Sequence, residues 1–96
     1  MTDVVAQAVT ALNEKLGGAG IDGTAKFNIE GEGSMMLDND GARVGDEEAD
    51  VIFNADAETL KEMFEGDLDP TSAFMSGRLS IDGDMGLAMK LAATLA

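Results

Sequence analysis

The last twelve residues of the chain, 85 to 96, constrain its fold most strongly, because they predict a helix that is apolar on nearly all sides. The chain has 19 acidic and 6 basic residues and a formal charge of −13, yet this segment holds one lysine, Lys90, and no acid. A helix that is apolar all round is either buried in protein or in contact with lipid. Twelve residues are too few to span a bilayer, which takes about 20. We therefore expect this helix to pack on the rest of the chain, or on an apolar ligand that the chain holds.

The segment before this helix predicts a short helix and a strand. Pro70 suits the first turn of a helix, because its fixed φ and missing N–H cost nothing there. We expect Gly77 to end that helix. Residues 79–82 then alternate between apolar and polar, which is the pattern of a half-buried strand. Asp84 is placed to cap the final helix.

The first two thirds of the chain predict a helix, several strands and a second helix. Thr2 or Asp3 can cap a helix whose apolar stripe, from Val4 to Leu16, faces a core before Gly17-Gly18 ends it. Residues 26–30 and 34–38 alternate around a glycine-rich turn and predict a hairpin. Met36 faces away from Met35 and Leu37, which indicates that part of the reverse face is also covered. The remaining expected elements are strands at 43–44 and 50–54 and a helix that Asp56 caps and that runs to Glu65.

This order of elements predicts an α+β fold. The strands cluster with the helices and do not alternate with them one for one, so we expect a mostly antiparallel sheet of about five strands, covered on one face by helices. A chain of 96 residues is too short for a second core. We therefore expect residues 1–96 to form a single domain.

The composition argues against several classes of function. The chain has no cysteine and no histidine, and therefore no disulfide framework, no thiolate metal site and no histidine base. The excess of acid argues against nucleic acid as a partner and should repel anionic lipid surfaces. The chain also lacks tyrosine, a frequent oxyanion donor. We expect no catalysis, no metal and no cofactor.

Two short motifs are better explained as a flexible connector and a turn than as binding sites. Residues 18–23 read GAGIDG, but this match to a dinucleotide-binding loop follows a helix and precedes a strand, which is the reverse of the required order. Asp38 to Gly41 with Glu47 resembles half of a calcium-binding loop. The first ligand position of that loop would be Met36, so we expect a turn held by Asx-type hydrogen bonds.

The C-terminal third also carries a resemblance to a known family. The matching positions, at fixed spacing, are Gly66, Leu68, Pro70, Ala73-Phe74-Met75, Gly77, Leu79, Ile81, Gly83-Asp84, Ala88 and Lys90-Leu91. This run resembles the C-terminal signature of the sterol carrier protein 2 family, the non-specific lipid-transfer domains. Upstream, residues 37–38 with Gly41, 49–51 and 58–60 are similar to the family in the same order, so the resemblance covers roughly Ile21 to the end of the chain.

The resemblance implies an apolar tunnel between the sheet and the helices, and a protein that binds and transfers a lipid without catalysis. The ligand would be a fatty acid, a fatty acyl group, or a molecule like a sterol or a terpenoid. The seven methionines suit a site of irregular shape, although without the resemblance we would interpret them as core filler. The lipid-lining residues that we expect are Phe27, Ile29, Met35, Leu37, Val51, Phe53, Leu60, Met63, Phe64, Phe74, Met75, Leu79, Ile81, Leu87, Met89, Leu91 and Leu95, with residues 87–95 as a lid.

A protein-interaction module is the alternative function. In that interpretation the apolar C-terminal helix docks on a partner enzyme or forms a homodimer with a second copy. Contact with membranes is expected to be transient at most. Family members of peroxisomes end in a targeting tripeptide, whereas this chain ends Thr94-Leu95-Ala96, so we expect a cytoplasmic protein.

Overall fold

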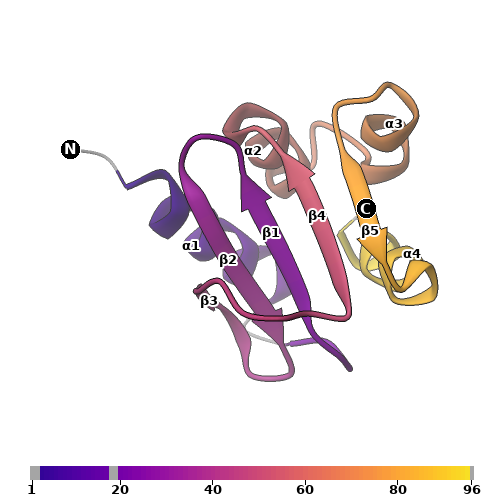
Figure 1. Cartoon of the computed structure of the whole chain (residues 1–96). Coiled ribbons are helices and arrows are strands. Elements are labelled where there is room, and N and C mark those ends of the chain that lie inside the picture. The colour runs from indigo at the N-terminus through magenta and orange to yellow at the C-terminus, as the bar shows by residue number, and fades with distance from the viewer. Residues whose placement is uncertain (1–2, 18–19, 96) are drawn as a thin grey trace.

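The computed structural model describes residues 3–17 and 20–95, and it shows a five-stranded sheet with helices on one of its two faces (Figure 1). In chain order the elements are α1 (Val4–Leu16), β1 (Ala25–Ile29), β2 (Gly33–Asp38), β3 (Gly41–Val44), β4 (Val51–Ala55), α2 (Ala57–Glu65), α3 (Pro70–Met75), β5 (Ser80–Gly83) and α4 (Met85–Leu95). The predicted α+β fold, with a mostly antiparallel sheet covered on one face, is confirmed.

The strands are arranged in the order β3-β2-β1-β4-β5. Three of the four neighbouring pairs are antiparallel, and β1 pairs with β4 in parallel, with Phe27 opposite Phe53. Parallel neighbours need a connection that crosses the sheet. Here the chain leaves β1 through the β1–β2 hairpin and β3, and it then has to pass β2 and β1 again to reach β4.

The core lies between the sheet and the helices. Inward side chains alternate along β1 and β4, so that Phe27 and Phe53 stack with their ring centroids 5.0 Å apart. Phe64 of α2 meets Phe27 edge-on at 5.8 Å. Burying a large apolar side chain contributes about 1.5–3 kcal/mol. Side chains of the sheet and the helices therefore pack against one another and fill most of the space between the two layers.

The helix ends in the described residues follow the predicted caps. Asp3 accepts a hydrogen bond from the N–H of Ala6, and Asp56 accepts one from the N–H of Thr59 at 2.7 Å. Asp84 accepts one from the N–H of Leu87 at 3.1 Å, so its predicted capping of α4 is confirmed. α3 ends at Met75, and Gly77 follows its C-cap Ser76 in the left-handed conformation, with its N–H donating to the carbonyl of Phe74 at 3.2 Å, so the predicted end at Gly77 is confirmed. The predicted caps Thr2 and Gly18 lie outside the described residues.

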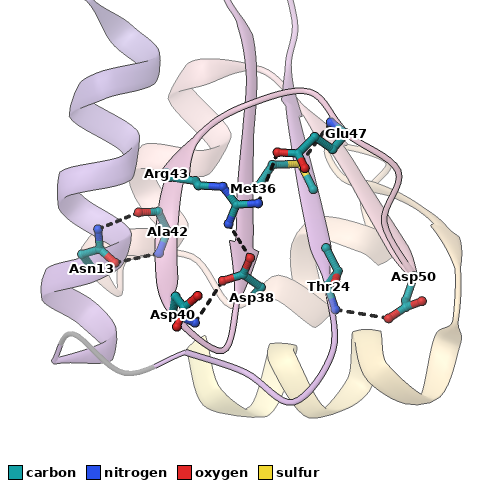
Figure 2. A network of polar contacts seen from close by, with 9 residues as sticks. All are labelled: Asn13, Thr24, Met36, Asp38, Asp40, Ala42, Arg43, Glu47 and Asp50. Atoms are coloured by element: carbon teal, nitrogen blue, oxygen red, sulfur yellow. Dashed lines mark hydrogen bonds and ion pairs between the residues drawn. The ribbon is translucent and has the colours of Figure 1, made fainter.

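Residues 45–50, here called the strap, cross the open face of the sheet and join β3 to β4 (Figure 2). Arg43 forms ion pairs with Asp38 of β2 and, at 3.2 Å, with Glu47 of the strap. Met36 lies beneath, and its sulfur accepts the N–H of Glu47 at 3.5 Å. Met36 points away from the helices and is fully buried, so the strap covers the reverse face there, as the sequence predicted.

The turn between β2 and β3 is held by Asp38. One carboxylate oxygen accepts the N–H of Asp40 at 2.9 Å, which confirms the predicted Asx-type turn (Figure 2). The hydrogen bond from Arg43, and then that from Asp40, hold the pKa of Asp38 below its usual value. The lowered pKa favours the charged carboxylate, which joins the turn to the strap through Arg43.

The final helix packs on the rest of the chain, as expected, but on one side only. Ala88, Leu91 and Leu95 are buried, whereas Met85 and Met89 are exposed. Among residues 3–17 and 20–95, no helix has both the length and the apolar character needed to cross a bilayer. Part of α4 is thus apolar surface in contact with solvent.

Candidate functional site

A hollow of about 470 Å³ opens between α1 and α2, next to the last residue of β1. This volume lies within the range of about 300–1,000 Å³ that is usual for small-molecule sites. Its lining comes from three elements: Val4, Gln7, Ala8 and Ala11 from α1, Ile29 from β1, and Ala57, Glu58, Leu60, Lys61, Phe64 and Glu65 from α2.

The hollow has an apolar floor and a polar rim. Ile29, Leu60 and Phe64 are buried, with 5% or less of each residue exposed. The solvent-exposed residues of the same lining are Gln7, Glu58, Lys61 and Glu65. Ligand sites are mostly apolar, with a few polar groups that orient the ligand. The floor suits an aliphatic chain, and the rim suits a polar head group.

Small side chains leave the space between the two helices. α1 and α2 contact each other along the edge of the core. Ala8 and Ala11 of α1 and Ala57 of α2 lie where larger apolar residues would meet across this contact. Because each of these positions carries only a methyl group, the helices pack without filling the gap. The hollow is therefore specified by three alanines as much as by its floor.

Lys61 is the cation of this lining. Lys26, Arg43 and Arg78 each form an ion pair with a carboxylate. Within the described residues Lys61 forms none, although the chain is rich in acid. An exposed ammonium without a partner can pair with an incoming carboxylate. The described part of the chain holds no cluster of three or more acidic side chains suited to a metal ion.

The residues predicted to line a lipid site fall into four groups. Ile29, Leu60 and Phe64 line the hollow. Nine more of the predicted residues are buried in the core: Phe27, Met35, Leu37, Val51, Phe53, Met63, Leu79, Leu91 and Leu95. Ile81 and Leu87 are half-buried and pack against that core. The last group, Phe74, Met75 and Met89, is exposed.

The exposure of these three residues corrects the expectation that they line the lipid site. The exposed fractions of Phe74, Met75 and Met89 are 45%, 80% and 71%. The buried residues of α3 are Pro70 and Ala73, and those of α4 are Ala88, Leu91 and Leu95. Their side chains therefore point toward solvent and do not line an interior tunnel.

The sequence interpretation missed the part of the site that α1 supplies. Val4 and Ala8 belong to the apolar stripe from which this helix was predicted, but the stripe was assigned to the core alone. Gln7 and Lys61 carried no pattern of their own. The signal that could have located the hollow was the pairing of small residues, Ala8 and Ala11 on one helix with Ala57 on another. The hollow lies beside α1, whereas the expected tunnel was closed by α4.

Solved structures of similar fold include sterol carrier proteins. Sterol Carrier Protein 2 Like 2 from Aedes aegypti is 21% identical, with a TM-score of 0.76, and the likeness covers 94% of each chain. A second protein of this mosquito, Sterol Carrier Protein-2 in complex with a C16 fatty acid, palmitate, has a TM-score of 0.77 at 17% identity and covers all of this chain and 97% of the other. These likenesses establish the fold.

Comparison of sequences gives the family. Hydroxysteroid dehydrogenase-like protein 2 from Danio rerio is 51% identical over 77 residues, which are 72% of this chain and 19% of that protein. The human protein of the same name is 42% identical over 73 residues, 68% of this chain and 18% of that protein. The chain thus spans about a fifth of the length of these relatives. Residues 8–96 match the SCP-2 sterol transfer family, and the chain belongs to it.

Proposed function

We propose that this chain binds a lipid with one long aliphatic chain and an acidic head group, of the fatty-acid class, in the hollow between α1 and α2. The observation that carries this proposal is the buried floor of Ile29, Leu60 and Phe64 in a lining that also holds Lys61, whose ammonium forms no ion pair within the described residues. The Aedes aegypti protein of the same fold, which is solved with palmitate, supports a ligand of this class. The chain would release its ligand unchanged, as a carrier.

The apolar part of the ligand would supply most of the affinity. Each buried CH₂ group contributes about 0.8 kcal/mol, so a chain of about 16 carbons could gain up to ~12 kcal/mol if it were fully buried. Loss of translational freedom and ordering of the chain offset several kcal/mol of this gain. An exposed ion pair with Lys61 would add only about 0.2–1 kcal/mol. We therefore expect micromolar affinity with weak selectivity for chain length.

The carrier role is also consistent with the relatives, in which the region similar to this chain is only part of a longer protein. Those proteins are named hydroxysteroid dehydrogenase-like, and this chain corresponds to about a fifth of their length. It has no histidine, cysteine or tyrosine, so it lacks several of the side chains that most often act as general acids and bases. We propose that a chain of this kind presents an apolar molecule to an enzyme and does not itself perform the reaction.

Titration of the delipidated protein with a fluorescent fatty acid tests the proposal. We expect saturable binding of one ligand per chain, with competition by an unlabelled C16 fatty acid and weaker competition by cholesterol. Mass spectrometry of lipids retained through purification gives the natural ligand class. Stronger competition by cholesterol would replace the fatty acid with a sterol. A lack of saturable binding by either lipid would refute a lipid site in this hollow.

A further inference from the structure

The charge of this chain is distributed unevenly along it. Residues 1–69 hold 17 acidic and 4 basic residues and therefore carry the whole net charge of −13. Residues 70–96 hold two acids, Asp82 and Asp84, and two bases, Arg78 and Lys90, and are neutral overall. α3 and α4 contain no acidic residue at all. One part of this acidic protein is thus free of net repulsive charge.

The same neutral part displays large apolar side chains. Among the described residues, five such side chains are exposed, and four of them belong to α3 and α4. These four, here called the C-terminal face, are Phe74, Met75, Met85 and Met89. The two helices contact each other and lie together at the β5 edge of the sheet (Figure 1). The fifth, Val44, lies on β3 at the opposite edge.

We propose that the C-terminal face rests on the surface of an uncharged, zwitterionic phospholipid bilayer while the chain loads or releases its ligand. This inference depends on the proposed function, because a carrier of lipids has to visit a lipid surface. The side chains would enter the outer part of the bilayer, where flexible methionines adapt to irregular apolar surroundings. Lys90 would keep its ammonium at the head groups while its stem lies along the apolar side chains.

The charge distribution points to neutral lipid. Proteins that lie on membranes usually combine an apolar face with lysine and arginine, which attract anionic lipids. This face has Arg78 and Lys90 nearby, but residues 1–69 carry −13. An anionic bilayer would repel that larger charge over roughly a Debye length, about 8 Å at physiological salt. Anionic lipid should therefore weaken the association, which is opposite to the usual dependence.

The size of the face favours a bilayer over a second copy of the chain. A large side chain presents about 200 Å² when free, so the exposed fractions of these four give roughly 500 Å². A standard protein interface buries about 800 Å² on each partner. Two copies would also bring two charges of −13 together. A reversible contact with lipid requires neither a larger area nor a matching shape.

Flotation of the full chain with phosphatidylcholine vesicles tests the proposal. We compare the wild type with the double variant Met75→Ser, Met89→Ser, and with Val44→Ser as the matched control for loss of an exposed apolar side chain. We expect the double variant to lower the partition coefficient about tenfold, because serine loses the apolar burial that each methionine would gain in the bilayer, whereas the control should not change it. Replacing part of the phosphatidylcholine with phosphatidylserine should lower binding at low salt, and added salt should restore it.

Three results would overturn the proposal. The wild type does not bind phosphatidylcholine vesicles, the double variant and the Val44→Ser control lose binding equally, or the wild type binds anionic vesicles more tightly. Sedimentation that shows a dimer of the wild type and a monomer of the double variant would assign the face to a second copy. Fatty-acid titration in the absence of vesicles separates the two proposals, because the double variant should bind ligand normally. If neither the wild type nor any variant binds a fatty acid while the wild type still binds vesicles, the proposed function is refuted and the contact between the C-terminal face and the bilayer stands.

Discussion

Phe27 of β1 stacks on Phe53 of β4, with the ring centroids 5.0 Å apart and the rings within 13° of parallel. The two residues are also opposite one another in the parallel register of the two strands. This contact lies at the centre of the sheet order β3-β2-β1-β4-β5, where the N-terminal hairpin meets the β4–β5 pair. We therefore expect the stability of the N-terminal hairpin and that of the β4–β5 pair to be coupled through this contact.

Phe53→Ala should therefore destabilise the whole domain. Phe53 is almost fully buried, and truncation of a buried phenylalanine costs about 3–5 kcal/mol of unfolding free energy. Many domains have only about 5–15 kcal/mol in total. Urea unfolding followed by circular dichroism measures the change. Phe74→Ala, the same substitution at an exposed position, is the control and should change the unfolding free energy by less than about 1 kcal/mol. Equal losses in the two variants would contradict the assigned core.

The strap should respond to pH through Asp38. The hydrogen bonds from Arg43 and Asp40 lower the pKa of Asp38 in the folded chain. Its contribution to stability is therefore complete above the unfolded pKa, which is about 3.9, and is lost as the pH falls through the lower folded value. Asp38→Asn removes this contribution. The difference in unfolding free energy between wild type and variant should be constant near neutral pH and should shrink in more acidic buffer.

A control separates this effect from the general protonation of the many other acids. Asp67→Asn removes an exposed carboxylate that forms no ion pair within the described residues. Its difference from the wild type should show no comparable loss in acid. If the Asp38→Asn difference grows as the pH falls, or does not change at all, the Arg43–Asp38 pair does not act as the structure indicates.

Ala8→Leu should block the hollow between α1 and α2. The three added carbon atoms would occupy the gap that Ala8, Ala11 and Ala57 leave. We expect fatty-acid affinity to fall at least about tenfold, because a ligand would lose two or more buried CH₂ groups at about 0.8 kcal/mol each. Thermal stability should stay equal or rise, since leucine favours a helix nearly as much as alanine does. Fluorescence titration and thermal unfolding give the two readouts.

Ala6→Leu is the matched control for that variant. Ala6 is an exposed residue of the same helix and is not part of the lining. The substitution adds the same atoms to α1 without entering the hollow. Unchanged ligand affinity in Ala8→Leu, or an equal decrease in Ala6→Leu, would place the ligand elsewhere.

Lys61→Gln should weaken the binding of fatty acids selectively. The variant removes the ammonium at the rim and keeps a side chain of similar length. Because an exposed ion pair contributes about 0.2–1 kcal/mol, affinity for a fatty acid should fall about threefold. Affinity for the alcohol of the same chain length should not change, and Lys61→Arg should restore fatty-acid binding. Lys90→Gln on α4 serves as the control of equal charge. A similar loss for acid and alcohol would exclude recognition of the head group by Lys61.

The elements of this fold could be predicted because their signals are local. Asp3 with Gly17 and Asp56 with Gly66 mark the two ends of α1 and α2. Alternation of apolar and polar residues gave β1 and β2, and the half-covered reverse face was indicated by Met36. The family could also be identified, because its signature lies at fixed spacing in one continuous segment. All of these features depend on residues that are close together in the chain.

What could not be predicted depends on distant contacts or on empty space. The parallel pairing of β1 with β4 depends on the strap crossing the sheet, and no residue near either strand specifies it. In α4, apolar residues on every side do not tell which side is buried, so Met89 and Leu91 were both assigned inward, whereas only Leu91 is buried. The hollow is the absence of side-chain atoms between two helices. A sequence shows three alanines there but not the distance between them.

The central claim, that a lipid lies between α1 and α2, is tested most directly by an NMR titration of the isotope-labelled chain with a C16 fatty acid. We predict that the largest changes in amide chemical shift occur at Ala8, Ala11, Leu60 and Lys61, and that they saturate at one ligand per chain. Changes centred on Leu87 and Leu91 of α4, with none along α1, would contradict this location of the site.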